Sequence, residues 1–216
     1  MFRLIQSPHE AVTLVGAGDA TIELLKIALT HAPVLVAADG GARLALEAGV
    51  MPRAVIGDFD SSGDLDLPKE VRIVQPDQNS TDFDKCLRAI DAPLFIGVGF
   101  LGGRLDHQLA SLTTLLGDQR PIVLISAHEL AFIAPRDIEI ELPDGSPCAF
   151  YPLIAARLTT CGVEYPLSDA DVAPEGLIST SNSVSGGRVR IATDRHGVLV
   201  TLPIAALPAV LRALGR

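Results

Sequence analysis

Short apolar runs alternate with amphipathic stretches through the first half of the chain, and this alternation constrains the fold more than any other feature. The apolar runs lie at residues 11–15, 34–38, 54–56, 71–74, 94–98 and 122–125. Stretches with helical spacing of apolar residues lie between them, at 20–30, 42–48, 82–90 and 105–116. Strands that alternate with helices in this way are typical of a doubly wound parallel sheet. The pattern predicts an α/β domain over residues 1–127.

The pattern changes near residues 127–129, where we place the domain boundary. Short alternating runs follow at 138–142, 148–151, 157–159, 177–180, 188–193 and 198–202, separated by turn residues such as Pro143-Asp144-Gly145 and Ser185-Gly186-Gly187. Such a series of short strands predicts a small antiparallel β-sandwich over residues 128–216. The last apolar segment, 204–214, is expected to form a short closing helix, although Pro208 opposes that interpretation.

Composition excludes several classes of function. The chain has 216 residues and a net charge of −9, with 26 acidic and 17 basic residues and no basic cluster, which argues against nucleic-acid binding. No apolar run approaches the roughly 20 residues that span a membrane, and no signal peptide is recognisable. Cys86, Cys148 and Cys161 are too scattered for a zinc site and suit a reducing compartment, so we expect a cytoplasmic protein.

Two carboxylates follow the apolar run at 54–56. In an extended backbone, Asp58 and Asp60 leave on the same face and point into one space. Two such charges about 5 Å apart repel by roughly 3 kcal/mol at an effective dielectric constant near 20. A cation, a shared proton or solvent must relieve that repulsion, and a solvated acidic turn is the simpler alternative.

Two further polar clusters stand where a predicted strand leads into a predicted helix. In the first, Thr81 and Asp84 fit a capping box, and a helix N-terminus there would also suit a phosphate, with Asp82 as a further carboxylate and Lys85 as a point charge. The second is Gly102-Gly103-Arg104-Leu105-Asp106-His107, in which Arg104 offers a bidentate fork to phosphate oxygens. Simple helix starts remain the alternative for both clusters.

The three clusters together indicate a class of chemistry. Carboxylates without a Cys or His ligand set favour an all-oxygen magnesium site over zinc. Carboxylates, a metal and Arg or Lys are the parts that hold a polyphosphate and stabilise its transfer. The chain contains neither a P-loop motif nor a Gly-x-Ser-x-Gly elbow.

A dinucleotide site is the main rival within the α/β domain. Gly16-Ala17-Gly18 follows a predicted strand, and Asp39 ends the next one, where a ribose-binding acid would lie. Thr21 stands at the third glycine position, so a tight strand-to-helix turn is the competing interpretation of this segment.

The chain resembles the thiamine pyrophosphokinase (thiamine diphosphokinase) family. The resemblance rests on segments in the family's order and spacing: Ala38-Asp39-Gly40-Gly41-Ala42, Gly57-Asp58-Phe59-Asp60-Ser61, Asp77-Gln78 with Thr81-Asp82 and Lys85, Gly102-Gly103-Arg104-Leu105-Asp106-His107, and Ser179-Thr180-Ser181-Asn182-Ser183. It covers nearly the whole chain, and the family's architecture is an α/β domain followed by a β-sandwich.

The resemblance implies transfer of a diphosphoryl group from ATP to the hydroxyl of thiamine, with Mg²⁺ and a homodimer whose active sites lie between subunits. It implies that metal and phosphates are held by Asp58, Asp60, Asp82 and Asp106, with Arg104 in the catalytic set. It also implies nucleotide contacts from Asp39, Ser61, Gln78, Thr81, Lys85, Arg104 and His107.

For thiamine, the resemblance implies recognition by Ser181 and Asn182, which we place in a loop after a strand at 177–180. Some family members place a tryptophan against thiamine, whereas this chain has none and carries Tyr165 near that place. Two rival functions remain, a pyrophosphokinase for another hydroxymethyl heterocycle such as a pterin and a nicotinamide oxidoreductase.

Overall fold

The computed structural model describes residues 5–215, which fall into two units that meet in the sequence after Ala127. The N-terminal unit ends at Ala127, and the C-terminal unit begins at His128.

A parallel sheet forms the centre of the N-terminal unit. Six strands lie in the order β8-β7-β2-β3-β4-β5, and each neighbouring pair is parallel. They are β2 (Val12–Val15), β3 (Val34–Ala38), β4 (Ala54–Gly57), β5 (Arg72–Val74), β7 (Phe95–Val98) and β8 (Ile122–Ile125). Every residue of β2, β4, β7 and β8 is buried, as expected for strands covered on both faces.

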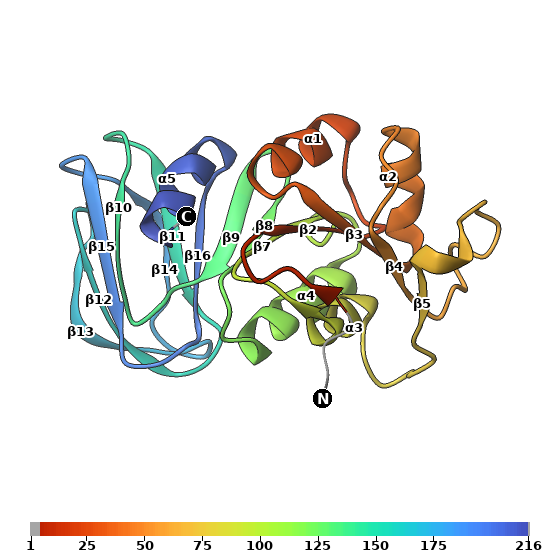
Figure 1. The fold of residues 1–216 in the computed structure, drawn as a ribbon. Coiled ribbons are helices and arrows are strands. Elements are labelled where there is room, and N and C mark those ends of the chain that lie inside the picture. The colour runs from red at the N-terminus through yellow and green to blue at the C-terminus, as the bar shows by residue number, and fades with distance from the viewer. Residues whose placement is uncertain (1–4, 216) are drawn as a thin grey trace. The chain divides into compact units, whose positions relative to one another are not determined.

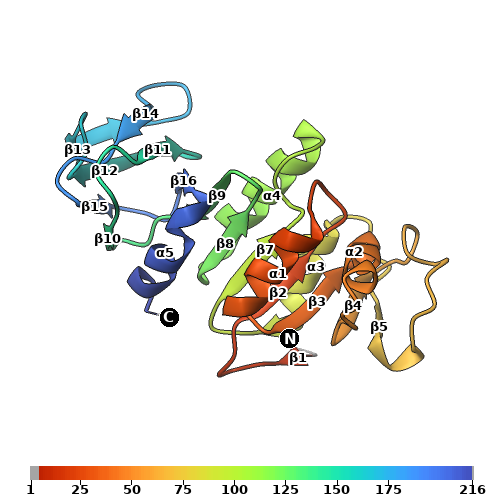
Figure 2. The same cartoon turned by 90° about the horizontal axis from the view of Figure 1, so that it is seen from above.

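Helices cover both faces of this sheet (Figure 1 and Figure 2). Helices α1 (Ile22–His31) and α2 (Ala42–Glu47) lie on one face, and α3 (Asp82–Ala89) and α4 (Leu105–Gly117) on the other. The Thr21 hydroxyl starts α1 by accepting the Leu24 N–H at 3.2 Å. The predicted doubly wound α/β domain is therefore confirmed.

Four minor elements complete the N-terminal unit. Strands β1 (Ile5–Gln6) and β6 (Ile90–Asp91) pair in parallel as a separate ribbon. Two 3₁₀ turns, η1 (Asp39–Gly41) and η2 (Lys69–Val71), follow β3 and precede β5.

Two antiparallel sheets build the C-terminal unit. One has the strand order β14-β11-β16-β9 and the other β10-β15-β12-β13. The strands are β9 (Glu129–Ile133), β10 (Asp137–Glu141), β11 (Pro147–Pro152), β12 (Ala156–Cys161), β13 (Leu167–Val172), β14 (Ser179–Ser183), β15 (Arg188–Thr193) and β16 (Val198–Pro203). Burial alternates along β10, β11, β12 and β15, which confirms the sandwich.

Three details of this unit differ from the sequence interpretation. Strands β9 and β13 were not predicted, because β9 is buried without alternation and β13 is a largely exposed polar edge strand. The strand expected at 177–180 lies at Ser179–Ser183 instead, and the apolar side chains of Leu177 and Ile178 are exposed outside it.

The closing helix forms as expected after the short 3₁₀ turn η3 (Ile204–Ala206). Helix α5 (Leu207–Ala213) carries Pro208 in its first turn, where a missing N–H costs no helical hydrogen bond. Within residues 5–215, no helix combines the length and apolar character that a bilayer span requires.

Candidate active site

The strand order places a cavity where the connections of the parallel sheet diverge. Chains leave β2 and β7, which are neighbours in the sheet, toward opposite faces, and ligands of doubly wound sheets bind at such a point. A cavity of about 670 Å³ lies there. Its lining combines glycines of the two turns (Gly16, Gly18, Gly99, Gly102 and Gly103) with Ser61, Thr81, Asp82, Arg104 and His107.

The glycine turn after β2 is explained by close packing of two backbones. A Cβ atom on Gly18 would lie 2.4 Å from the carbonyl oxygen of Gly99, and the Gly18 N–H donates to that oxygen at 3.1 Å. The structure therefore supports the tight-turn interpretation of residues 16–18. These glycines let the two turns meet at the base of the cavity.

An aromatic pair in the cavity wall was missed by sequence reasoning. Phe83 and Phe100 stack with ring centroids 4.2 Å apart and an angle of 25° between their planes. They come from α3 and from the turn after β7, so no local pattern links them. The pair gives the cavity a flat apolar surface beside its polar groups.

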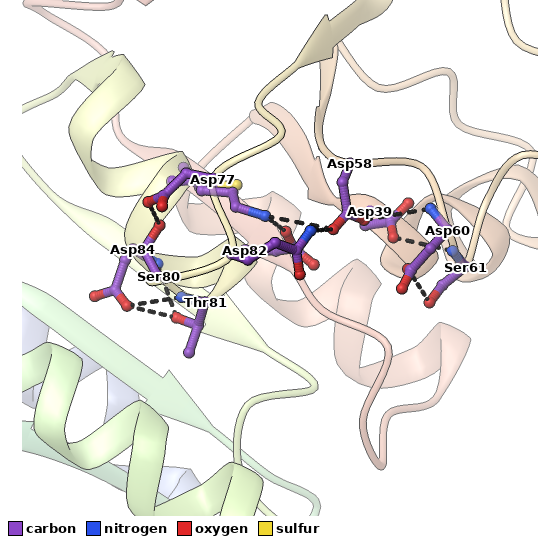
Figure 3. A network of polar contacts seen from close by, with 12 residues as sticks. Asp39, Asp58, Asp60, Ser61, Asp77, Ser80, Thr81, Asp82 and Asp84 are labelled. Carbon is purple, nitrogen blue, oxygen red and sulfur yellow. Dashed lines mark hydrogen bonds and ion pairs between the residues drawn. The ribbon is translucent and has the colours of Figure 1, made fainter.

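Three carboxylates converge beside this cavity (Figure 3). Asp39, Asp58 and Asp60 each offer an oxygen, and these oxygens lie within 4.8 Å of one another. The convergence of Asp58 and Asp60 does not come from an extended backbone, which corrects the sequence argument. Phe59 between them has a positive φ of 65°, and Asp58 Oδ1 accepts the Asp60 N–H at 3.3 Å. A left-handed turn thus brings the two side chains together, at a cost of about 1–3 kcal/mol for a non-glycine residue.

Asp39 has a supporting role that the sequence did not indicate. Its side chain is buried, its φ is +37°, and it accepts hydrogen bonds from the Ser61 N–H at 3.1 Å and from the Ser62 hydroxyl. Burial raises the pKa of this carboxyl, against the effect of the two hydrogen bonds. Both oxygens are engaged with the turn after β4, so this carboxylate is not presented to a ribose as the dinucleotide interpretation requires.

A buried lysine balances the carboxylates. The Lys85 side chain is 4% exposed, and its ammonium lies 2.8 Å from Asp82 and 3.9 Å from Asp58. Burial opposes the charged form, but the hydrogen bond to Asp82 and the nearby negative charges outweigh it and raise the pKa of Lys85. The Gln78 amide donates to Asp58 at 2.8 Å and, with the Asp60 N–H and Lys85, lowers the pKa of Asp58.

Helix α3 begins with the predicted capping box. The Thr81 hydroxyl accepts the Asp84 N–H at 3.1 Å, and the Asp84 carboxylate accepts the Thr81 N–H at 3.1 Å. The other Asp84 oxygen accepts the Thr114 hydroxyl of α4 at 2.8 Å. Asp84 therefore fixes the start of α3 against α4, and with it the positions of Asp82 and Lys85.

Arg104 and Asp106 pair with each other at the start of α4. The guanidinium donates to the two carboxylate oxygens at 3.1 Å and 2.6 Å, and both side chains are largely exposed. This pairing lowers the pKa of Asp106. Asp106 thus lies outside the converging carboxylates, although we expected it among the metal ligands. Asp82, also expected there, lies outside the group as well and bonds to Lys85. Asp39 takes the third place in the group instead.

Two of the residues expected to recognise thiamine lie in a strand and not in a loop. Ser181 has a positive φ of 56° at a β-bulge in β14, where the register with β11 shifts. Ser181 is exposed, whereas the next residue, Asn182, is 3% exposed. Tyr165, 63% exposed, is held to Asn182 by hydrogen bonds. The structure therefore brings these three residues together within the C-terminal unit.

Comparisons with known proteins agree with this architecture. Residues 25–125 match the family model for the thiamin pyrophosphokinase catalytic domain, and residues 136–198 match the model for the thiamin pyrophosphokinase vitamin B1 binding domain. The chain is 30% identical over 203 residues to thiamine pyrophosphokinase 1 of Arabidopsis thaliana, an alignment that covers 76% of each chain.

Solved structures show the same fold. The crystal structure of thiamine pyrophosphokinase from Bacillus subtilis superimposes with a TM-score of 0.72 at 22% identity, covering 90% of this chain and 98% of the other. Thiamin pyrophosphokinase from Candida albicans gives a TM-score of 0.74 at 18% identity, covering 90% of each chain.

Proposed function

The chain belongs to the thiamin pyrophosphokinase family, and we propose that it is a thiamine diphosphokinase. It transfers a diphosphoryl group from ATP to the hydroxyl oxygen of thiamine and releases AMP. The observation that carries the proposal is the group of Asp39, Asp58 and Asp60, supported by Lys85, at the edge of a cavity of about 670 Å³. Such an anionic group beside a cavity is suited to a metal-bound polyphosphate.

The donor set fits Mg²⁺. All three converging groups are carboxylates, and oxygen ligands are those that Mg²⁺ prefers. Asp58 and Asp60 would hold the ion, with Asp39 close by and fixing their turn through Ser61 and Ser62. A bound Mg²⁺ would neutralise charge on the transferred phosphates. Asp82 would act on this group through Lys85, and Asp106 is paired with Arg104 outside the group.

The residues around the cavity would hold the nucleotide. Arg104 would exchange Asp106 for phosphate oxygens, because its fork matches both acceptors and the pair is exposed. Thr81, Ser61 and His107 line the same cavity, and Lys85 supplies a fixed positive charge behind the carboxylates. Gln78 would contribute by holding Asp58, to which it already donates.

The C-terminal unit would bind thiamine through Ser181 and Tyr165. Both are exposed, and they offer a hydroxyl group and an aromatic ring for an aminopyrimidine. The family model that matches this unit is described as a vitamin B1 binding domain, which supports the assignment.

A homodimer is part of the same proposal. Exposed leucines at the start of α4, Leu105 and Leu109, and exposed Leu177 and Ile178 before β14 support it, because such side chains favour association. Light scattering coupled to gel filtration measures the mass directly, and a monomer at micromolar concentration would contradict the proposal.

An assay of AMP release tests the proposed function. Purified protein is incubated with ATP and thiamine, with and without Mg²⁺, and AMP and thiamine diphosphate are quantified. We expect both products in equal amounts and only with Mg²⁺. In parallel reactions a hydroxymethylpterin replaces thiamine, and an oxidised nicotinamide cofactor replaces ATP with the alcohol of thiamine as hydride donor. AMP formed with the pterin but not with thiamine, or reduction of the nicotinamide cofactor, would replace the proposal with one of its rivals.

A further inference from the structure

Asn182 is the only Asn or Gln between His128 and Arg216, and its side-chain amide bonds to protein groups on every side. Its Oδ1 accepts the N–H of Tyr165 at 3.1 Å and that of Ser183 at 2.9 Å. Its Nδ2 donates to the carbonyl of Tyr165 at 2.9 Å and to the Ser179 hydroxyl at 3.5 Å. The carbonyl acceptor and the two N–H donors also fix which end of the amide is oxygen. All hydrogen-bonding positions of the amide are engaged with the protein.

The bonds to Tyr165 extend the contact between β14 and the segment that precedes β13. Residues 163 and 164 pair by backbone with β14, through the Val163–Val184 bridge and a bond of 2.9 Å from the Glu164 N–H to the Ser183 carbonyl. The N–H and the carbonyl of Tyr165 bond to the Asn182 side chain, in the place where a backbone group of β14 would continue the pairing. An amide side chain reproduces the donor and acceptor of a peptide group.

Asn182 and Tyr165 differ in their exposure to solvent. Asn182 is 3% exposed, so its polar groups face protein, whereas Tyr165 is 63% exposed. The left-handed conformation of Ser181 turns Asn182 inward and leaves Ser181 itself exposed. Ser181 and Tyr165 are therefore accessible from solvent, whereas the Asn182 side chain is not.

We propose that Asn182 is a positioning residue, which holds the backbone of Tyr165 so that its ring forms one wall of the site for an aromatic heterocycle. The proposal rests on the proposed function and deepens it. It replaces the direct contact between Asn182 and the thiamine pyrimidine that the family resemblance implies, because the amide has no hydrogen-bonding group left to offer.

Hydrogen exchange and kinetics test this role separately. Asn182→Ala, Tyr165→Ala and the double variant are compared with Thr180→Ala, an exposed neighbour in β14. We expect Asn182→Ala to speed amide exchange in residues 163–167 at least tenfold, and Thr180→Ala to leave it unchanged. This measurement needs no enzymatic activity, so it stands even if the proposed function fails.

The KM values for thiamine test whether Asn182 acts through Tyr165. Asn182→Ala and Tyr165→Ala should each raise the KM for thiamine five- to tenfold and leave the KM for ATP within twofold. The double variant should match Tyr165→Ala within twofold, because Asn182 has nothing left to position. Unchanged exchange, or effects on the thiamine KM that multiply in the double variant, would overturn the proposal in favour of direct contact.

A gentler substitution keeps the test decisive if Asn182→Ala does not fold. Asn182→Asp retains the oxygen that accepts the Tyr165 N–H and loses the group that donates to its carbonyl. Faster exchange in residues 163–167, with a thiamine KM that rises more than the ATP KM, would support the positioning role. No change in either measurement would overturn it.

Discussion

Replacement of Lys85 by methionine tests whether this lysine balances the carboxylates that surround it. Methionine keeps most of the volume and the helix propensity of the side chain in α3 and removes the charge. At an effective dielectric constant near 20, a unit charge pair is worth about 6 kcal/mol at the 2.8 Å separation from Asp82 and about 4 kcal/mol at the 3.9 Å from Asp58. Loss of Lys85 leaves both carboxylates without this partner.

The net effect is smaller than the two interaction energies. Asp58 and Asp82 remain 21% and 32% exposed, so water screens them, and the lysine itself no longer has to be desolvated. Removal of one partner from a buried charge pair destabilises proteins by about 3–5 kcal/mol, and partial exposure brings our expectation to about 2–4 kcal/mol.

Urea denaturation followed by circular dichroism at 222 nm measures this loss. The chain has no tryptophan, and α1–α4 lie in the N-terminal unit, so the helical signal mainly reports that unit. Lys26→Met is the matched control, because Lys26 is an exposed residue of helix α1, and we expect it to change the free energy of unfolding by less than about 0.5 kcal/mol.

A second substitution identifies the cause of the loss. Adding Asp82→Asn to Lys85→Met removes one of the two carboxylates that lost their partner, and it should recover about 1 kcal/mol or more. If Lys85→Met costs less than about 1 kcal/mol beyond the Lys26→Met control, the electrostatic reasoning fails. If Asp82→Asn makes the variant less stable still, the loss belongs to packing and not to charge.

Three further expectations follow from the same contacts. Asp58→Asn and Asp60→Asn should each lower AMP release by several orders of magnitude with the fold intact, and exposed Asp66→Asn should not; near wild-type turnover of both variants at saturating Mg²⁺ would refute the metal site. Arg104→Lys keeps a charge and loses the bidentate fork, so it should lower kcat/KM for ATP about tenfold or more; unchanged kinetics would make the pair with Asp106 purely structural. Arg190 lowers the pKa of Asp137 below its ordinary value of 3.8, and Arg157 does the same for Asp169. The stability that these two ion pairs add is therefore present above pH 3.8 and is lost as the pH falls through the lowered pKa values. Near-ultraviolet dichroism of the two tyrosines, both in the C-terminal unit, should show a weaker loss of stability below pH 4 in Arg190→Gln and Arg157→Gln than in the unmodified chain, and identical acid transitions would refute the linkage.

Features that depend only on neighbouring residues could be predicted from the sequence. Buried parallel strands are short apolar runs, and all six predicted runs of the first half lie in β2, β3, β4, β5, β7 and β8. The capping box at Thr81 and Asp84 needs only a spacing of three residues, and it is present. Because the carboxyl ends of parallel strands meet at one edge of a sheet, the predicted sheet also places the turn after β4 near the start of α3. Lys85 and Asp58, which come from these two segments, do lie close together.

Which polar groups are already bonded to the protein could not be predicted, because their partners come from distant parts of the chain. Asp39 looked like a ribose ligand, yet the Ser61 N–H and the Ser62 hydroxyl occupy it, and these partners stand more than twenty residues away in the sequence. Asp106 was expected among the metal ligands from the resemblance, and in the structure its carboxylate pairs with Arg104. Asn182 looked like a loop residue that reads a substrate, but a bulge in a polar edge strand turns it onto Tyr165. A carboxylate or an amide bonds to whichever donor the fold brings within 3 Å or so of it, and that depends on backbone conformation and on distant segments. Residue type and spacing therefore indicate where a site lies, while the role of each side chain in it is set by the partners that folding supplies.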